Sequence, residues 1–406
     1  MTALTLLCFI SAGLLAQVAL AIVIAVQRSG RVSAESVEVD RARPAESAAS
    51  WAGLRPFRVR RRDYEDDALA QCSFYLEPID GRPLTPYRAG QFLTFQLDLA
   101  DAQGALRPVT RCYSLSDRHD PTVYRVTIKR IPPPADRPYA PPGLVSAHFH
   151  DHAIPGSIVQ VRAPAGAFVL DDEPGMTAVL IAGGIGITPL FAMAREELAK
   201  EPDRAIHLFY GVRDSRELIF EAAIDAMRER HPNFHVTIVQ SRPLPDEAED
   251  CQATGFIDVP LLQRTLPRGV HRFYVCGPPP MMASLVPALR AWNGADDAVR
   301  YEAFGPASLA LAAAVKPVPL DQPLTVRFAR SGRTLSWTGE ETNLLDFAER
   351  HGIDVESGCR SGSCGTCETT VSSGDVRYPQ PPSFDIAAGR CLLCVGAPVG
   401  DLVLDA

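Results

Sequence analysis

Residues 359–367 read CRSGSCGTC, and this stretch decides how the C-terminal part of the chain is interpreted. Its three cysteines have the C-x4-C-x2-C spacing that is typical of plant-type 2Fe-2S sites. Three thiolates from one tight loop must converge on a small cluster, so the backbone needs the freedom that Gly358, Gly362 and Gly365 provide. A structural zinc site would favour paired C-x2-C knuckles, and a disulfide is disfavoured in a reducing compartment. The spacing therefore predicts a 2Fe-2S cluster.

The cluster needs a fourth thiolate. Cys391 and Cys394 are separated from Cys367 by 23 and 26 intervening residues, and by spacing alone either could supply it. Upstream of the loop, LTVRFARSGRTLSWT (324–338) predicts two strands joined by a turn. TNLLDFAERHG (342–352) then predicts a helix that is capped by its first threonine and ended by its glycine.

This C-terminal unit resembles the plant-type ferredoxins, specifically those fused to flavin reductases. Its ending, LLCVGAPVGDLVLDA (392–406), is similar to the last ligand-bearing strand of that family. The resemblance covers residues 321–406 and implies a β-grasp fold in which Cys391 is a small buried side chain. The ligands that it implies are Cys359, Cys364, Cys367 and Cys394.

Length and charge restrict the classes of protein to which the chain can belong. A chain of 406 residues is expected to fold as two or three domains. With 46% hydrophobic and 22% charged residues, its composition is that of a folded globular protein. It has 40 Lys and Arg against 48 Asp and Glu, a net charge of −8, which is the opposite of what a nucleic-acid partner requires.

The first apolar segment predicts a membrane anchor. Residues 4–26 read LTLLCFISAGLLAQVALAIVIAV, 23 positions without a charge, which as a helix could cross about 30 Å of hydrocarbon. A secretory signal peptide is the alternative, but no Lys or Arg precedes the run. Arginines follow it, so the positive-inside rule predicts a single-pass protein of the inner (cytoplasmic) membrane, with its catalytic part in the cytoplasm. Residues 1–27 would be the anchor and 28–50 a linker.

The remaining chain divides into units with different hydrophobic patterns. From 51 to 172, short alternating runs such as QFLTFQLDL (91–99) predict an antiparallel barrel or sandwich. The family resemblance given below implies that it is an FAD-binding β-barrel. From 173 to 306, strands alternate with helices, as in AVLIAGGIGI and FAMAREELAK, which predicts a parallel α/β domain. A linker, 307–320, separates it from the ferredoxin-like unit. The expected fold class is thus multidomain α/β and β, preceded by a transmembrane helix.

Residues 111–114, RCYS, have the side chains that a flavin needs: a cation for phosphate, a ring to pack and a hydroxyl donor. Alone they are weak evidence, since a strand arginine can simply pair with a surface carboxylate. Followed by YRVTIKR, PPGLVSAHFHDH and PAGAFVLD, however, they resemble the ferredoxin-reductase superfamily, and closely its flavohaemoglobin-like branch. This implies FAD rather than FMN and makes a metal site at the alternating histidines 148, 150 and 152 unnecessary. The implied FAD contacts are Arg111, Tyr113, Ser114, Lys129, Gly143, Val145 and Ser146.

The sequence GGIGITP (183–189) follows an apolar strand and opens a helix, a context that suits a pyrophosphate. YVCGPPPMM (274–282) completes the nicotinamide pattern of the same superfamily. The resemblance places Cys276 near the nicotinamide C4, although an ordinary buried thiol remains an alternative. It also places Phe304 of YEAFGP (301–306) against the flavin ring, with Glu302 beside it in the catalytic region. The implied nucleotide contacts are Gly183, Gly184, Gly186, Thr188, Pro189, Gly277 and Pro278.

The choice between NADH and NADPH stays open. Arg213, Arg216 and the pair Ser241 and Arg242 follow strands where a 2′-phosphate could bind, but they could equally face solvent. The resemblance does not imply haem, since the match is confined to the reductase part of the flavohaemoglobins.

Taken together, these motifs predict a membrane-anchored electron-transfer enzyme. A nicotinamide gives two electrons as hydride and a 2Fe-2S cluster accepts one, so a flavin between them is needed as a converter. We expect an NAD(P)H-dependent reductase with FAD and a 2Fe-2S cluster that supplies an oxygenase, hydroxylase or cytochrome. A membrane quinone as acceptor and a non-enzymatic redox sensor are the alternative hypotheses.

Overall fold

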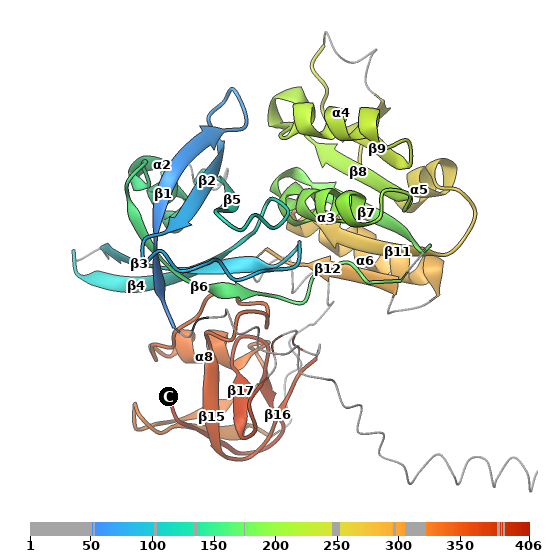
Figure 1. Ribbon diagram of the computed structural model, residues 1–406. Coiled ribbons are helices and arrows are strands. Elements are labelled where there is room, and N and C mark those ends of the chain that lie inside the picture. The colour runs from blue at the N-terminus through green and yellow to red at the C-terminus, as the bar shows by residue number, and fades with distance from the viewer. Residues whose placement is uncertain are drawn as a thin grey trace, which may run out of the picture. The chain divides into compact units, whose positions relative to one another are not determined.

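Among the residues that it describes, the computed structural model contains three large β-sheets with their covering helices and one two-stranded sheet (Figure 1). The predicted anchor and both predicted linkers, residues 1–27, 28–50 and 307–320, lie outside the residues that it describes. The described residues are 51, 53–100, 104–133, 137, 139–173, 175–245, 252–294, 298–304, 322–379, 382, 384 and 386–406.

The predicted transmembrane helix, and the inner-membrane localisation that followed from it, are corrected. Among the described residues, no helix is both long enough and apolar enough to cross a bilayer. The longest of them, α6 (Pro279–Asn293), has 15 residues, which at 1.5 Å per residue is about 22 Å against about 30 Å of hydrocarbon. The apolar run 4–26 is not among the described residues.

The first sheet is antiparallel throughout and has the strand order β4-β3-β6-β1-β2-β5. An antiparallel bridge from Leu115 to Val126 joins its two edges, so the sheet closes into the predicted barrel. The interior is apolar because alternate strand residues, such as Phe57 and Val59 in β1, point inward and are fully buried. One helix, α2 (Leu144–His152), packs against it through Phe149. The strands are β1 (Arg55–Tyr64), β2 (Gln71–Pro78), β3 (Phe92–Ala100), β4 (Leu106–Ser114), β5 (Tyr124–Lys129) and β6 (Ile158–Ala165).

The second sheet is parallel, in the order β10-β9-β8-β7-β11-β12. Along its central strand β7, Leu180 packs with the helices of one face and Ile181 with those of the other. Burial on both faces explains why this strand is apolar without alternation. The strands are β7 (Thr177–Gly183), β8 (Ile206–Val212), β9 (Phe234–Gln240), β10 (Ala253–Thr254), β11 (His271–Cys276) and β12 (Val299–Glu302). The helices are α3 (Ile187–Lys200), α4 (Glu221–Arg230), α5 (Val259–Thr265) and α6, with short 3-10 turns η1 (Gly184–Gly186) and η2 (Ser215–Glu217).

The third sheet has the order β14-β13-β19-β15-β17 and packs against helix α8 (Leu344–Arg350). The helix cap differs from the predicted one: Asn343, not Thr342, is the N-cap, and its Oδ1 accepts a hydrogen bond from the backbone N–H of Asp346 at 2.9 Å. Asparagine caps a helix at least as well as threonine, and here it lies one residue closer to the apolar stripe. The strands are β13 (Leu324–Phe328), β14 (Arg333–Trp337), β15 (Glu368–Ser373), β17 (Arg390–Leu392) and β19 (Leu402–Leu404), beside a small pair, β16 (Val376–Arg377) and β18 (Ala397–Pro398).

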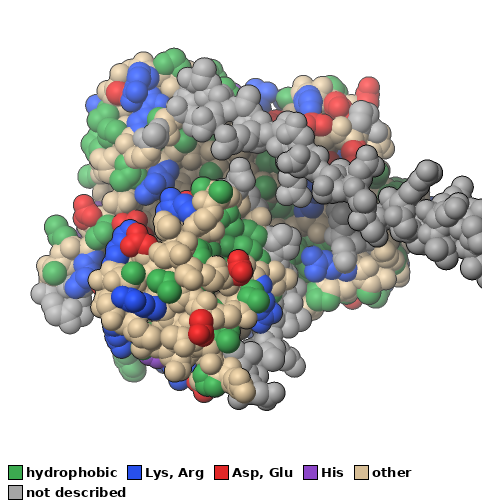
Figure 2. Space-filling model, turned by 90° about the horizontal axis from the view of Figure 1, so that it is seen from below, with side chains coloured by type: hydrophobic (Ala, Val, Ile, Leu, Met, Phe, Trp, Pro, Cys, Tyr) green, Lys and Arg blue, Asp and Glu red, His purple; other side chains and the backbone are tan. Residues whose placement is uncertain are grey.

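Apart from the membrane helix, the predicted fold class is confirmed: a barrel, a parallel α/β sheet and a small β-rich unit follow one another. Acidic and basic side chains are interspersed on the face of the molecule that Figure 2 draws. The excess of acidic residues is therefore not gathered into one patch on that face.

A buried ion pair joins α3 to the chain that leads into β8. Nη1 of Arg204 lies 2.5 Å from Oε1 of Glu197, and their side chains are only 2% and 6% exposed. The guanidinium also donates to the carbonyl oxygens of Met176 and Asp171. Removing one partner leaves a buried charge without its counter-ion, which costs far more than the net contribution of the intact pair.

We therefore expect Glu197→Ala to lower the free energy of unfolding by about 3–5 kcal/mol, measured by denaturant titration. Glu197→Gln should lose less because it keeps an acceptor. As the control, Asp225→Ala removes the partner of Arg228 in an exposed pair, whose side chains are 44% and 54% exposed, and should change stability by less than about 1 kcal/mol. Equal losses in the two alanine variants would contradict the argument.

Candidate functional site

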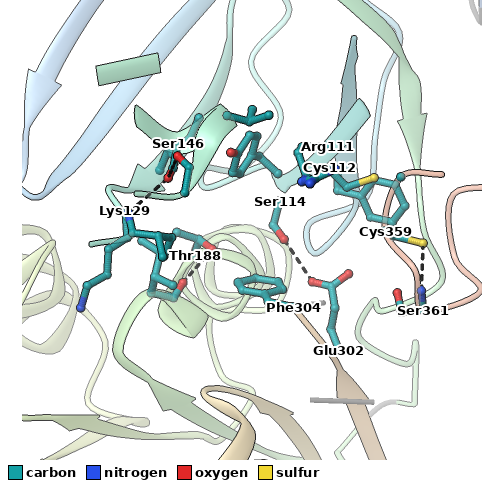
Figure 3. A pocket seen from close by; sticks show the side chains of 18 of the residues that line it. Arg111, Cys112, Ser114, Lys129, Ser146, Thr188, Glu302, Phe304, Cys359 and Ser361 are labelled. Atoms are coloured by element: carbon teal, nitrogen blue, oxygen red, sulfur yellow. Dashed lines mark hydrogen bonds between the residues drawn. The ribbon is translucent and has the colours of Figure 1, made fainter. Parts of the chain in front are cut away.

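A cavity of about 560 Å³ collects side chains from distant parts of the chain (Figure 3). The barrel contributes β4, β5 and the start of α2, the α/β unit contributes the end of β12, and the cysteine loop contributes one wall. The predicted site residues that line it are Arg111, Tyr113, Ser114, Lys129, Gly143, Val145, Ser146, Thr188, Glu302, Phe304 and Cys359. Predicted flavin contacts and a predicted cluster ligand thus share one cavity.

The barrel side of the cavity suits a phosphate-bearing ligand. Gly143 precedes the first turn of α2, and this helix start lines the cavity together with Arg111 and Lys129. A helix N-terminus presents free backbone N–H groups and the positive end of the helix dipole, and the two cations add charge. A side chain at Gly143 would not fit, because a Cβ there would lie 2.8 Å from Oγ of Ser146. The donor set therefore fits the pyrophosphate of a dinucleotide.

Lys129 also has a protein partner. Its Nζ lies 3.3 Å from Oε1 of Glu217, in η2 of the α/β unit, and both side chains are 24% exposed. A bound phosphate at this position would compete with Glu217 for the ammonium group.

Aromatic side chains on the same cavity suit a planar ring. Tyr113 packs edge-on against Phe95 and Phe149 of the barrel core, and it lines the cavity with Phe92 and Phe304. Burial raises the pKa of Tyr113, so its hydroxyl stays protonated and can only be a neutral hydrogen-bonding group. Phe304 is 39% exposed, as expected of a ring with one face free to pack against a planar ligand.

The glycine turn and the loop after β11 pack backbone to backbone beside this cavity. A Cβ on Gly186 would lie 2.2 Å from the carbonyl oxygen of Cys276, and one on Gly183 would lie 2.5 Å from Sδ of Met281. Helix α3 begins at Ile187, so Thr188 and Pro189 lie in its first turn. The close approach of the turn to the loop after β11 therefore requires glycine at these positions. The N-terminus of α3 also offers free backbone N–H groups to the phosphates of a second dinucleotide.

Cys276 and Glu302 end two neighbouring strands, β11 and β12, and are register partners. Cys276 is fully buried, and burial, with a smaller effect of the Glu302 charge, raises the pKa of its thiol well above the usual range. The structure thus gives Cys276 no thiolate character.

Glu302 is a carboxyl group whose surroundings favour the neutral form. It points into the cavity, where Oγ of Ser114 donates to its Oε2 at 3.1 Å (Figure 3). Loss of hydration raises its pKa to about 8; the Ser114 hydrogen bond opposes this, and the charge of the nearby Cys359 adds to it. At neutral pH a large fraction of Glu302 therefore carries a proton at the boundary between the barrel and the cysteine loop.

The predicted cluster ligands form two pairs rather than one group. The backbone N–H of Cys359 donates to Sγ of Cys364 at 3.3 Å, and their thiols are in hydrogen-bond contact. The thiols of Cys367 and Cys394 are likewise in contact, which lowers the pKa of Cys367 and raises that of Cys394. Across the described part of the chain, no three His, Cys, Asp or Glu side chains surround a single ion position. Two pairs fit a two-iron cluster, in which each iron takes two protein ligands.

Backbone donors already point at the ligand sulfur. The N–H group of Ser361 donates to Sγ of Cys359 at 3.4 Å (Figure 3). The N–H group of Ser363 donates to the same sulfur at 3.3 Å. Arg360 has a positive φ of 55°, and Gly362 and Gly365 have φ values of 75° and 71°. These left-handed residues turn successive N–H groups inward, so the loop fits an anionic iron-sulfur cluster.

Cys391 behaves differently from Cys394. It lies in the apolar core of the small unit, only 1% exposed, and burial raises its pKa to about 12. The structure therefore brings Cys394, and not Cys391, into contact with another predicted ligand.

Sequence reasoning did not single out Cys112, although it lies between two predicted flavin residues. It lines the cavity, as do Arg360, Ser361 and Ser363 of the cysteine loop. Only the period-two alternation of β4 could have indicated that Cys112 points away from Arg111 and Tyr113. Of the predicted site residues, those outside the cavity lining form the adjoining glycine turn, the loop after β11 and the remaining cysteines. They are Gly183, Gly184, Gly186, Pro189, Cys276, Gly277, Pro278, Cys364, Cys367 and Cys394.

Two parts of the chain match known protein families. Residues 180–286 match the family described as "Oxidoreductase NAD-binding domain", and residues 326–399 match "2Fe-2S iron-sulfur cluster binding domain".

Relatives with known names divide into two groups. A flavohemoprotein of Rhodopirellula baltica is 34% identical over 261 residues, which cover 63% of this chain and 62% of that protein, so the chain spans a little over three fifths of such relatives. The glycine betaine monooxygenase reductase subunit of Pseudomonas aeruginosa is 28% identical over 334 residues, covering 79% of this chain and 87% of that one. Among solved structures, phthalate dioxygenase reductase aligns with a TM-score of 0.52 and 26% identity over 87% of this chain and 98% of that one.

The two cysteines that spacing left equivalent provide a matched test. We expect Cys394→Ala to lose the visible absorbance and the electron paramagnetic resonance signal of a 2Fe-2S cluster, because its sulfur pairs with Cys367. Cys391→Ala should retain both signals, since it removes only a buried thiol from the core. The reverse pattern would contradict the pairing seen in the structure.

The raised pKa of Glu302 predicts how stability depends on pH. The folded protein holds this proton up to about pH 8, whereas the unfolded chain releases it near pH 4.5, so the stabilisation is complete below pH 4.5 and is lost as the pH rises to 8. Between pH 5 and 8.5 we expect the free energy of unfolding of the cofactor-free protein to fall by on the order of 2 kcal/mol from this group. Denaturant titrations should give a smaller fall for Glu302→Gln, and an unchanged slope would contradict the assignment.

Proposed function

The chain combines a ferredoxin-reductase-like FAD/NAD-binding region with a C-terminal 2Fe-2S domain, and on this premise we propose that it is an NAD(P)H-dependent reductase that supplies electrons to a separate oxygenase. The proposed cofactors are FAD and one 2Fe-2S cluster, with NADH or NADPH as the substrate. Among the named relatives, one is a monooxygenase reductase subunit, and phthalate dioxygenase reductase is described as a modular structure for electron transfer from pyridine nucleotides to a 2Fe-2S centre.

The observation that carries the proposal is the shared cavity. Arg111 and Lys129 of the barrel line it together with Cys359 of the cysteine loop. A flavin held by the barrel residues would therefore lie beside a ligand of the cluster, with no intervening domain. Electron transfer between the flavin and the cluster needs such proximity. A protein that bound the two groups for unrelated purposes would not need to hold them close together.

When bound, FAD and the cluster together supply the conversion of a two-electron hydride delivery into single-electron transfer. The protein contributes binding, orientation and electrostatics. The start of α2, with Arg111 and Lys129, would hold the flavin phosphates. Tyr113 and Phe304 would hold the ring, and the hydroxyl of Ser114 fixes Glu302 beside it.

The nucleotide would approach from the α/β unit. The close packing of Gly183 and Gly186 against the loop of Cys276 leaves backbone N–H groups at the start of α3 for its phosphates. Ligands in parallel α/β sheets bind at the carboxyl ends of the strands, which is where β7 and β11 end here. Cys276 is a buried neutral thiol in this arrangement, so its role would be to shape the nicotinamide seat and not to transfer a proton.

An oxygenase is the acceptor class that the named relatives favour, and hydroxylases and cytochromes are the other classes that a one-electron donor could serve. The cysteine loop is the part of the chain that would deliver the electron.

The proposed function is tested by anaerobic stopped-flow reduction of the purified protein with NADH and with NADPH. We expect loss of the flavin absorbance first and of the cluster absorbance second, because hydride can enter only at the flavin. The nucleotide that gives the faster first phase is the physiological reductant.

Two results would contradict the proposal. One is a protein that is reduced by neither nucleotide after reconstitution with FAD and the cluster. The other is a flavin that is reduced while the cluster stays oxidised, although dithionite reduces it; the contact between the two sites would then have no role in electron transfer.

A further inference from the structure

Glu217 links the α/β unit to the barrel at the edge of the cavity. It is the last residue of η2, the short turn that follows β8. Its carboxylate contacts Lys129, whose Nζ lies 3.3 Å from Oε1, and its carbonyl oxygen accepts a hydrogen bond from Nε2 of Gln71 at 3.2 Å. Gln71 and Lys129 are register partners on β2 and β5. Both contacts of Glu217 therefore fall at one position of the barrel sheet.

Lys129 also belongs to the predicted flavin site. It lines the cavity together with Arg111 and the start of α2, a set of groups that suits the phosphates of a dinucleotide. Figure 3 shows that its side chain extends away from Ser114 and Glu302. The ammonium group thus has two candidate partners. One is the Glu217 carboxylate, which it contacts in the structure, and the other is a phosphate of bound FAD.

Glu217 does not depend on Lys129 for its position or for a counter-ion. Nη2 of Arg213, four residues earlier, lies 3.4 Å from the same Oε1 atom, and the Arg213 side chain is 61% exposed. The hydrogen bond from Gln71 holds the backbone of Glu217 independently of its carboxylate. If Lys129 turned to a phosphate, Glu217 would keep one cation and its backbone contact. Only one ion pair would have to break.

The ion pair that would break is weak. The side chains of Lys129 and Glu217 are both 24% exposed, so water still reaches their charges. Exposed ion pairs contribute at most about a factor of five to an equilibrium constant. A phosphate is a stronger acceptor for an ammonium group, because its hydrogen bonds are charge-assisted and the start of α2 adds its own N–H groups. The phosphate can therefore displace Glu217, but part of its binding free energy is spent on doing so.

We propose that Glu217 is a positioning residue that competes with the phosphates of FAD for Lys129. It holds the ammonium group in the flavin-free protein, releases it when FAD binds, and so lowers the affinity of the protein for its flavin. This inference rests on the proposed function only in so far as the cavity binds FAD. Because Glu217 belongs to the α/β unit, the exchange also removes one contact between the barrel and the unit that would bind the nucleotide.

The experiment measures the affinity of the full-length, flavin-free protein for FAD by the quenching of flavin fluorescence. In Glu217→Gln, which keeps the size of the side chain and removes its charge, we expect the dissociation constant to fall by about twofold to fivefold. No carboxylate then has to be displaced from Lys129. Lys129→Gln should bind FAD more weakly than the wild-type protein, because it removes a cation from the cavity.

A double variant separates competition for Lys129 from simple repulsion between Glu217 and the phosphates. If Glu217 acts through Lys129, Glu217→Gln should have no effect in a protein that already carries Lys129→Gln. Asp151→Asn is the matched control, since Asp151 pairs with Arg130, the neighbour of Lys129, at 2.6 Å and neither residue lines the cavity. It removes the same charge. At an ionic strength of about 0.15 M, where the screening length is about 8 Å, it should leave the dissociation constant unchanged.

Several results would overturn the inference. An unchanged or higher dissociation constant in Glu217→Gln would mean that Glu217 only stabilises the boundary between the barrel and the α/β unit. An equal decrease in Asp151→Asn, or a decrease that persists beside Lys129→Gln, would mean that the effect is one of overall charge. Titration with NAD+ in place of FAD should show no gain in Glu217→Gln, and a gain for NAD+ alone would assign Lys129 to the other dinucleotide.

Because FAD is the only ligand added in the main titration, its result does not depend on hydride transfer. A wild-type protein that binds FAD but is not reduced by NADH or NADPH would refute the proposed function and still give the dissociation constants that test Glu217. A wild-type protein that does not bind FAD would refute both.

Discussion

The two-faced geometry of strand β4 is the constraint on which the rest of the site depends. Arg111 and Tyr113 lie on one side of the strand, while Thr110 and Ser114 lie on the other, where Thr110 packs near Gly358 of the cysteine loop and Ser114 donates to Glu302 of β12. β4 lies at the end of the barrel sheet and is hydrogen-bonded along its length only to β3. Its register is therefore critical, since a slip of one residue would exchange the two faces and separate the flavin contacts from the cysteine loop.

Burial gives the boundary between the two predicted redox sites its chemical character. Glu302 and Cys276 end adjacent strands, and loss of hydration raises the pKa of both groups. A carboxyl group that is mostly protonated at neutral pH therefore lines the cavity that Cys359 also lines. A fixed negative charge in this place would oppose the arrival of an electron, so the desolvation that raises the pKa of Glu302 would also favour reduction nearby.

Close backbone approach is the second requirement of the architecture, and glycine meets it in both halves of the site. Gly186 allows the turn after β7 to touch the carbonyl of Cys276, and Gly358 allows the cysteine loop to sit on Thr110. A Cβ on Gly186 would lie 2.2 Å from that carbonyl oxygen, and one on Gly358 would lie 2.9 Å from Sγ of Cys364 and 3.2 Å from the methyl carbon of Thr110. Both approaches are close because the glycine has no side chain.

The sequence by itself determined the features that are local. The C-x4-C-x2-C spacing, the glycine turn after an apolar strand and the change from alternating to helical patterns each depend on neighbours within about ten residues, and the three sheets agree with them. The helix cap was misplaced by one residue because Thr342 and Asn343 are both good caps and only packing chooses between them. The expected membrane helix rested on hydropathy alone. Tertiary structure decided which distant side chains meet: Cys394 with Cys367, and Glu302 with Ser114. The first contact joins two segments of the C-terminal unit, and the second joins the barrel to the parallel sheet. Their positions follow from the packing of whole elements, for which no short stretch of sequence contains the information.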